Sequence, residues 1–123
     1  MTSQLTDFDA RYLDTWIEPD PATRRTNIEH LWSPGGQLAV SSLGITLTGI
    51  DEITTHIAGV HDGLIAGKGL RFSYDQQVES GDALLLRWSM TARNGEVVGR
   101  GVDTVFRDAE GKITRAYMFM GVN

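Results

Sequence analysis

Asp103 and His56 are the two side chains of this sequence with the clearest capacity for acid–base chemistry. Asp103 interrupts a largely apolar stretch, Gly101–Phe106, where a buried carboxylate costs free energy unless it has a partner. His56 follows Ile53 by three residues and precedes Val60 by four, so it lies near the apolar stripe of a predicted helix. An imidazole can accept a proton near neutral pH, and a neighbouring carboxyl such as Asp103 would orient it and raise its pKa.

Both residues also have a structural interpretation. Asp103 could form a buried salt bridge with Arg87 or Arg100, and His56 could be a partly exposed residue on the surface of its helix. His56 and His61 are five residues apart, which does not place them on one helical face, and no third ligand is near them in sequence. We therefore expect no metal site, and no motif indicates a cofactor.

The composition restricts the classes of function. A length of 123 residues fits a single domain spanning residues 1–123. The net charge of −5 argues against binding to nucleic acid or to an anionic membrane. The absence of cysteine excludes disulfides, thiolate metal ligands and a cysteine nucleophile. Neither a signal-peptide pattern nor a membrane-spanning apolar run occurs, so we expect a cytoplasmic protein.

Three helices are expected in the first half of the chain. The first carries Phe8, Tyr12 and Trp16 at intervals of four residues, which gives one apolar face. Aspartate followed by proline opens the second, and a Pro-Gly-Gly run ends it. A glycine-flanked segment with isoleucines and valine at helical spacing forms the third. The expected boundaries are Thr6 to about Glu18, Asp20 to Pro34, and Gly49 to Gly67.

Strands dominate the rest of the chain. Short turn-forming segments separate the last three long β candidates, so these should form an antiparallel meander. We expect an α+β fold in which a curved antiparallel sheet follows the helices. The expected strands are 37–41, 44–48, 70–79, 83–92, 96–107 and 112–122.

Strand parity assigns the side chains to two faces of the sheet. The apolar row of residues 84, 86, 88 and 90 should face the helices. In the last strand, apolar side chains occur on both faces, with Tyr117 and Phe119 at outward positions, and Phe106 is also outward in the strand before it. An apolar outer face fits a second copy of the chain, so we expect a homodimer that pairs through the convex side of the sheet.

Five short segments occur in the order found in one known superfamily: residues 11–13, 31–36, 49–53, 101–106 and 111–113. On these segments the chain resembles the nuclear transport factor 2-like superfamily, in particular its SnoaL-like polyketide cyclase and ketosteroid isomerase-like members. This resemblance implies a cone-shaped α+β roll, also known as a cystatin-like fold, whose curved sheet wraps around helices and encloses a pocket for a small apolar molecule.

The resemblance also implies roles for individual residues. In a steroid isomerase of this fold, a tyrosine and a protonated aspartic acid hold the developing enolate oxygen, and these positions fall on Tyr12 and Asp103. The position of the catalytic base falls on Val40, which cannot carry a proton, so His56 becomes the leading candidate for the base. The expected pocket lining comprises Trp16, Trp32, Val40, Val60, Trp88, Met90, Met118 and Met120.

These observations support two hypotheses about function. The first is a small-molecule-binding protein that acts as a cofactor-independent isomerase, cyclase or lyase on a carbonyl-bearing hydrophobic substrate. The second is a non-catalytic module that uses the same fold for ligand binding or dimerisation, and the valine at position 40 favours it. An enclosed pocket with a strongly perturbed Asp103 favours the first hypothesis, whereas a filled cone with Asp103 paired to an arginine favours the second.

Overall fold

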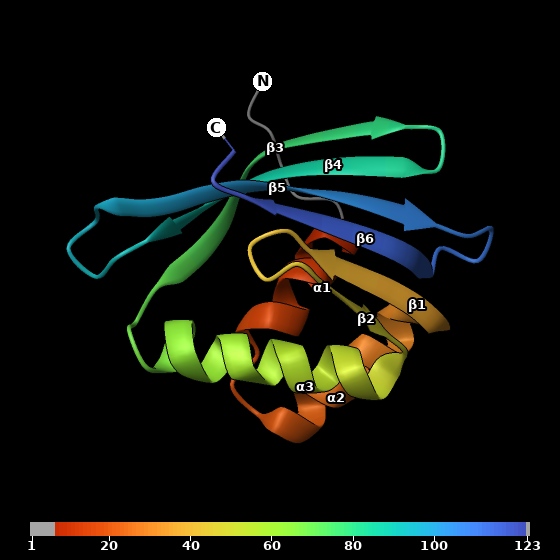
Figure 1. Ribbon diagram of the computed structural model, residues 1–123, viewed down its shortest axis with the longest axis horizontal. Helices are drawn as coiled ribbons and strands as arrows, with labels where there is room; N and C mark the ends of the chain where they lie inside the picture. The colour runs from red at the N-terminus through yellow and green to blue at the C-terminus, as the bar shows by residue number, and fades with distance from the viewer. Residues whose placement is uncertain (1–6, 123) are drawn as a thin grey trace.

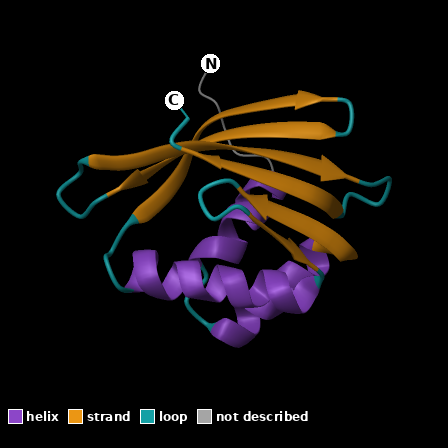
Figure 2. Cartoon of the chain, in the orientation of Figure 1, coloured by secondary structure: helices purple, strands orange, loops and turns teal. Residues whose placement is uncertain are grey.

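The computed structural model describes residues 7–122 and has a helical layer packed against one face of a six-stranded sheet (Figure 1). The helices are α1 (Asp7–Ile17), α2 (Pro21–Leu31) and α3 (Ile50–Val60), and α3 continues as the π-helical segment η1 (His61–Ala66). The strands are β1 (Trp32–Val40), β2 (Ile45–Thr48), β3 (Arg71–Ser80), β4 (Ala83–Thr91), β5 (Val97–Arg107) and β6 (Ile113–Met120). The helices lie together on one side of the curved sheet (Figure 2).

The helices follow the sequence pattern, with one difference at the end of α2. Asp20 caps α2, its carboxylate accepting a 2.9 Å hydrogen bond from the Thr23 amide, and Pro21 takes the first helical position as expected. The helix ends at Leu31, earlier than predicted, and the Pro-Gly-Gly run lies within β1, where the pairing with β6 is irregular. Trp32 therefore belongs to a strand. The cap expected at Thr6 lies outside the described residues.

The sheet has the strand order β2-β1-β6-β5-β4-β3. The expected antiparallel meander is confirmed, because β3, β4, β5 and β6 pair in sequence with their antiparallel neighbours. The pairing of β1 with β6 is parallel, so the sheet is mixed rather than wholly antiparallel. Parallel strands need a long connection, and here β2, α3, η1 and the strands β3 to β5 lie between β1 and β6 in the chain.

The inner face of the sheet carries the row predicted from parity. Leu84, Leu86, Trp88 and Met90 are all buried on the side of the helices. Opposite them in β5 lie two glycines, with Trp88 paired to Gly101 and Met90 paired to Gly99. A Cβ atom on Gly101 would overlap the Trp88 indole, and one on Gly99 would lie 2.5 Å from Cε of Met90. The two glycines thus let these large side chains lie across the neighbouring strand.

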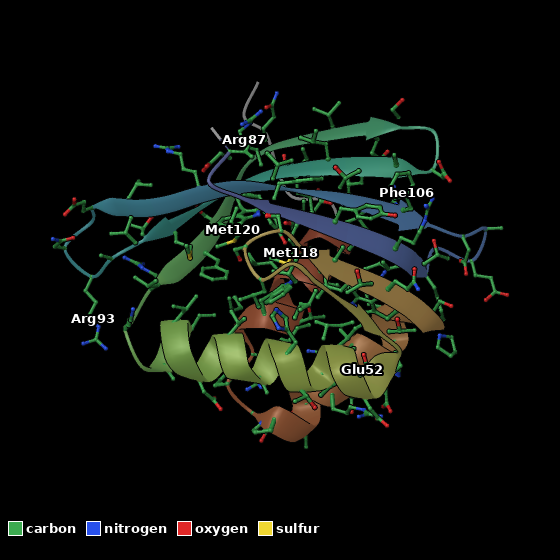
Figure 3. All side chains as sticks on the ribbon, in the orientation of Figure 1. Glu52, Arg87, Arg93, Phe106, Met118 and Met120 are labelled. Atoms are coloured by element: carbon green, nitrogen blue, oxygen red, sulfur yellow. The ribbon has the colours of Figure 1, made fainter. Side chains whose placement is uncertain are left out.

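The outer face of the sheet is partly apolar. Val78, Val98 and Phe119 are exposed there, whereas Phe106 is partly covered by Arg115, whose guanidinium lies 4.6 Å from its ring centre. Met118 and Met120 project from β6 towards the helices, while Arg87 lies on the opposite side of the sheet (Figure 3). Within residues 7–122, no helix is long and apolar enough to cross a membrane.

Candidate functional site

A cavity of about 160 Å³ lies between the sheet and the helices. Seven of the eight side chains predicted to line a pocket do line this cavity: Trp16, Val40, Val60, Trp88, Met90, Met118 and Met120. Asp103 and His56 also contribute to its wall. The cavity is therefore almost wholly apolar, with a carboxyl group and an imidazole on its surface.

Trp32 does not line the cavity, and the prediction for this residue is wrong. It is 1% exposed and belongs to the hydrophobic core. The reason is its position in β1: Trp32 pairs with Ile113 at the beginning of the strand, whereas the cavity lies at the other end, beside Val40. Because α2 ends at Leu31, Trp32 belongs to β1 and not to the helical layer, and it packs in this part of the core.

Asp103 is held by two uncharged donors. The indole Nε1–H of Trp88 donates a 2.8 Å hydrogen bond to Oδ1, and the Tyr12 hydroxyl donates a 3.3 Å hydrogen bond to Oδ2. The residue is 2% exposed. Neither donor carries a positive charge, so the carboxylate form has no compensating cation among these contacts.

The alternative of a buried salt bridge from Asp103 to Arg87 or Arg100 is wrong. Arg100 lies 3.9 Å from Asp75, and the Nε–H of Arg87 donates to the side chain of Gln76. Parity explains this outcome, because Asp103 faces the helices while both arginines occupy outward positions of their strands.

Burial has the largest effect on the pKa of Asp103. Desolvation raises its pKa from 3.8 to about 7, although the hydrogen bonds from Trp88 and Tyr12 act in the opposite direction. At neutral pH a large share of the molecules therefore carries a protonated carboxyl here. A neutral carboxylic acid in an apolar cavity can donate a hydrogen bond to a ligand, which a carboxylate cannot do.

Tyr12 supports Asp103 from behind. Its side chain is fully buried and does not belong to the wall of the cavity. Its ring stacks between those of Phe8 and Tyr74, with centroid distances of 6.3 and 6.5 Å. Burial and the neighbouring charge of Asp103 raise the pKa of the Tyr12 hydroxyl well above 10.0, so it remains a donor at physiological pH. Tyr12 thus positions Asp103 and does not itself face the ligand space.

His56 lies on α3 at the wall of the same cavity. Its ring makes an edge contact with Trp16, at a centroid distance of 6.2 Å. Burial lowers its pKa below 6.5, which contradicts the expectation of a pKa raised by a neighbouring carboxyl. No hydrogen bond between His56 and Asp103 is found in the structure of residues 7–122. The two groups line the same cavity, His56 from α3 and Asp103 from β5. With its lowered pKa, the imidazole is mostly neutral at pH 7.

Several lining residues were missed by sequence analysis. Phe72 and Tyr74 come from β3, where they pair with Met90 and Trp88, so parity applied to that strand would have placed them on the inner face. Leu43 lies in the turn between β1 and β2 and is 58% exposed, and Leu64 lies in η1. Both contribute to the cavity wall from opposite layers, and only the packing of distant segments brings them together.

No group of three or more metal-ligating side chains is found within the described part of the chain. Among its mostly apolar lining, the cavity has the carboxyl group of Asp103, the imidazole of His56 and the hydroxyl-bearing residues Ser42 and Tyr74. This set of groups suits hydrogen bonding and proton transfer.

A curved sheet closed by helices around an apolar cavity, with a buried acid in its wall, defines an α+β roll. The model of the SnoaL-like domain family matches residues 9–116. The chain therefore belongs to the SnoaL-like domain family, as the sequence resemblance indicated. A comparison with curated proteins finds no match.

Solved structures of the same fold cover nearly the whole chain. A candidate isomerase of the SnoaL-like family from Agrobacterium tumefaciens matches with 22% identity and a TM-score of 0.81, covering 92% of this chain and 93% of that one. A candidate polyketide cyclase from Sinorhizobium meliloti matches with 16% identity and a TM-score of 0.70, covering 93% and 94%. A nuclear transport factor 2-like protein of unknown function from Exiguobacterium has 23% identity and a TM-score of 0.72, covering 94% and 99%. At these identities the likeness establishes the fold.

Proposed function

We propose that this protein binds a small apolar carbonyl compound and isomerises it without a cofactor, with Asp103 holding the carbonyl oxygen. The observation that carries this proposal is the buried carboxyl of Asp103, which lies at the cavity wall with two neutral donors and, among residues 7–122, no lysine or arginine bonded to it. Burial keeps a large share of this carboxyl protonated near neutral pH. The protonated carboxyl can donate a hydrogen bond to a ligand in the cavity, and a carbonyl oxygen is a suitable acceptor.

The hydrogen bond would strengthen as the reaction proceeds. When a proton leaves the carbon next to the carbonyl, negative charge moves to the oxygen and forms an enolate. The acid of Asp103 interacts more strongly with this enolate than with the ketone, which is the condition for catalysis rather than simple binding. The Trp88 and Tyr12 donors hold the carboxyl in place and reduce the reorganisation it needs.

His56 is the proposed base. Its lowered pKa keeps the imidazole neutral and able to accept a proton at pH 7. It would take the proton from the α-carbon, whose bonding electrons move into the enolate. The imidazolium would then return the same proton to another carbon of the conjugated system, which completes an isomerisation with no net change in atoms or electrons. Val40 lines the cavity but offers no proton acceptor.

The comparisons give this proposal limited support. One structural neighbour carries an isomerase assignment and another a polyketide cyclase assignment. They belong to those proteins, and they favour this class of chemistry here only through the shared fold.

The test is enolisation itself. A small cyclic enone is incubated with the protein in D₂O, and exchange of its α-protons is followed by proton NMR, which detects proton abstraction whatever product forms. We expect exchange well above the protein-free rate, reduced at least tenfold in His56→Gln and in Asp103→Asn. His30→Gln is the matched control, because His30 is exposed and lies outside the cavity. Exchange that is unchanged in His56→Gln would refute the role of this base.

The alternative is a non-catalytic module of the same family. The observation in its favour is Val40, which stands at the wall of the cavity where the family resemblance locates a base. This alternative predicts that the enone binds and that its α-protons exchange no faster than in buffer. The NMR experiment separates the two functions, because binding is seen as line broadening of the ligand even where exchange is absent.

A further inference from the structure

The size of the cavity limits the ligand. Its volume is about 160 Å³. An apolar protein cavity of about 150 Å³ accommodates benzene, whereas pockets for drug-sized ligands measure about 300–1,000 Å³. The space here therefore matches one six-membered ring with a small substituent, and a ligand with several fused rings would have to extend out of its open side.

The sheet side of the cavity has little capacity to widen. Trp88 and Met90 lie over Gly101 and Gly99 of the neighbouring strand, so they already occupy the space that two side chains of β5 would have filled. Trp88 is fixed further by its hydrogen bond to Asp103 and by a stacked contact with Phe72 at 6.1 Å. Moving the indole aside to admit a larger ligand would remove a donor from a buried carboxyl, which is costly.

Other long side chains close the neighbouring wall. Met118 and Met120 project from β6 into the space between sheet and helices (Figure 3). On the opposite side, Val60 and Leu64 of the α3–η1 helix face them across the cavity. A ligand longer than one ring would have to extend past Leu43 into solvent, where its additional apolar surface stays wet and contributes little affinity.

We propose that the physiological ligand is a monocyclic ketone or enone, bound with its ring against Trp88 and its carbonyl oxygen at Asp103. This inference rests on the proposed function, since it takes the carbonyl contact from it, and it adds the size class of the substrate. The aromatic rings of Trp16, Phe72, Tyr74 and Trp88 supply apolar faces around the ring position. A steroid or a multi-ring aromatic polyketide would place part of its rings outside the cavity.

The test is a ligand series of graded size, measured by calorimetry at pH 6. The probes are cyclohex-2-en-1-one, a two-ring decalin-type enone, a four-ring steroid enone, and cyclohexene as the one-ring hydrocarbon without a carbonyl. We expect the one-ring enone to bind at least tenfold more tightly than the four-ring enone. Met90→Ala, which removes a long side chain from the wall, should improve binding of the two-ring enone at least fivefold. Leu84→Ala is the matched control, since Leu84 lies on the same face of β4 in the core and away from the cavity.

Each outcome separates the size class from the carbonyl contact. Tighter binding of the steroid than of cyclohex-2-en-1-one would overturn the size class and leave the carbonyl site intact. Equal affinity for cyclohexene and cyclohex-2-en-1-one, with the steroid excluded, would support the size limit and reject the hydrogen bond to Asp103. Failure of every probe to bind would reject both. An equal gain for the two-ring enone in Leu84→Ala would show that Met90 does not set the limit.

Discussion

Trp88 reaches Asp103 by lying across Gly101. The residues Trp88 and Gly101 are register partners in β4 and β5, and Asp103 lies two residues further along the same face of β5. The indole covers the position of the missing Cβ and thereby brings its Nε1 to 2.8 Å from Oδ1 of Asp103. A glycine in the middle of a strand thus determines the environment of a carboxyl group that it does not contact through any side chain.

The first prediction concerns Gly101→Ala. The new methyl group would overlap the indole of Trp88 and lie 2.6 Å from the carbonyl oxygen of Phe119, so the ring must move. We expect a loss of about 1–3 kcal/mol in the free energy of unfolding, the usual cost of overpacking, together with a changed tryptophan fluorescence spectrum. Gly59→Ala is the control, because a Cβ at that helical position meets no atom within 4 Å. It should leave stability equal or slightly higher, and a Gly101→Ala protein as stable as the parent would contradict the model of a packed indole.

The second prediction uses the pH dependence of stability. Below pH 3.8 Asp103 is protonated in both the folded and the unfolded chain. Between pH 3.8 and about 7 the unfolded chain releases a proton that the folded protein keeps, so this residue lowers the free energy of unfolding as pH rises, and the loss is complete above pH 7. The shift corresponds to about 4 kcal/mol, since each pKa unit equals about 1.4 kcal/mol.

Asp103→Asn should remove this slope, because an amide does not titrate. Urea unfolding at pH 4.5, 6.0 and 7.5 measures the difference in stability between the variant and the parent. We expect the variant to gain on the parent by several kcal/mol across this range. Asp75→Asn is the matched control for the loss of a carboxyl group, because Asp75 lies on the outer face with a 39% exposed side chain and does not line the cavity. A pH-independent difference for Asp103→Asn would place the pKa of Asp103 near its ordinary value.

The third prediction concerns Tyr12→Phe. The Tyr12 hydroxyl donates to Oδ2 of Asp103 and lowers the pKa of that carboxyl, so its removal should raise the pKa above 7. Binding of a ketone requires the protonated acid, and its affinity should fall as pH rises through the pKa of Asp103. In the variant this fall should shift to higher pH, which calorimetry with cyclohex-2-en-1-one between pH 5.5 and 9 would detect. An unshifted profile would mean that the 3.3 Å contact does not affect ionisation.

The fourth prediction concerns the pH profile of proton exchange. The proposed base must be neutral, which requires a pH above the lowered pKa of His56, and the proposed acid must be protonated, which requires a pH below about 7. The rate of α-proton exchange should therefore follow a bell with its maximum between these two values. Asp103→Asn should abolish the fall on the alkaline side. A rate that continues to rise through pH 8 in the parent protein would exclude these assignments.

The fifth prediction concerns assembly through the outer face of the sheet. Val78, Val98 and Phe119 are exposed on this face, with Phe119 44% exposed. We expect a homodimer in sedimentation experiments at micromolar concentration, converted to monomer by Phe119→Lys, because burying a lysine at an apolar interface is costly. Leu43→Lys, at the mouth of the cavity, should remain dimeric. A parent protein that is monomeric at this concentration would contradict the predicted homodimer.

The sequence predicted the structure correctly where the evidence was local, as in the alternation of side chains along a strand or the residues that start a helix. Parity predicted the buried face of β4, and the Asp20–Pro21 pair predicted the start of α2, because both depend on neighbouring residues. The partners of Asp103 were not predictable in this way. Trp88 and Tyr12 reach it from another strand and from the first helix, and the choice between an arginine and an indole depended on which face of β5 the carboxyl occupies.

Trp32 shows a case in which a clear local pattern predicted the wrong element. Its spacing after Ile28 and Leu31 fits a helical stripe, and the following Pro-Gly-Gly run is a strong helix stop. Tertiary pairing with β6 overrode this pattern and extended the strand back to residue 32. Similarly, the direction of the pKa shift of His56 could not be predicted from sequence. It depended on whether burial or a neighbouring charge has the larger effect, and burial does.

The parallel pairing of β1 with β6 has a consequence for how the chain folds. Trp32 meets Ile113 and Val40 meets Met118, so strands from opposite ends of the sequence must come together before the sheet is continuous. Contacts of such high sequence separation slow folding, since loop-closure entropy is lost before the contacts form. The β3–β6 meander can form first, and docking of β1 then brings Val40 against Met118 in the wall of the cavity. A ligand of this cavity needs the completed sheet, so it binds the folded chain alone and stabilises it against unfolding by mass action.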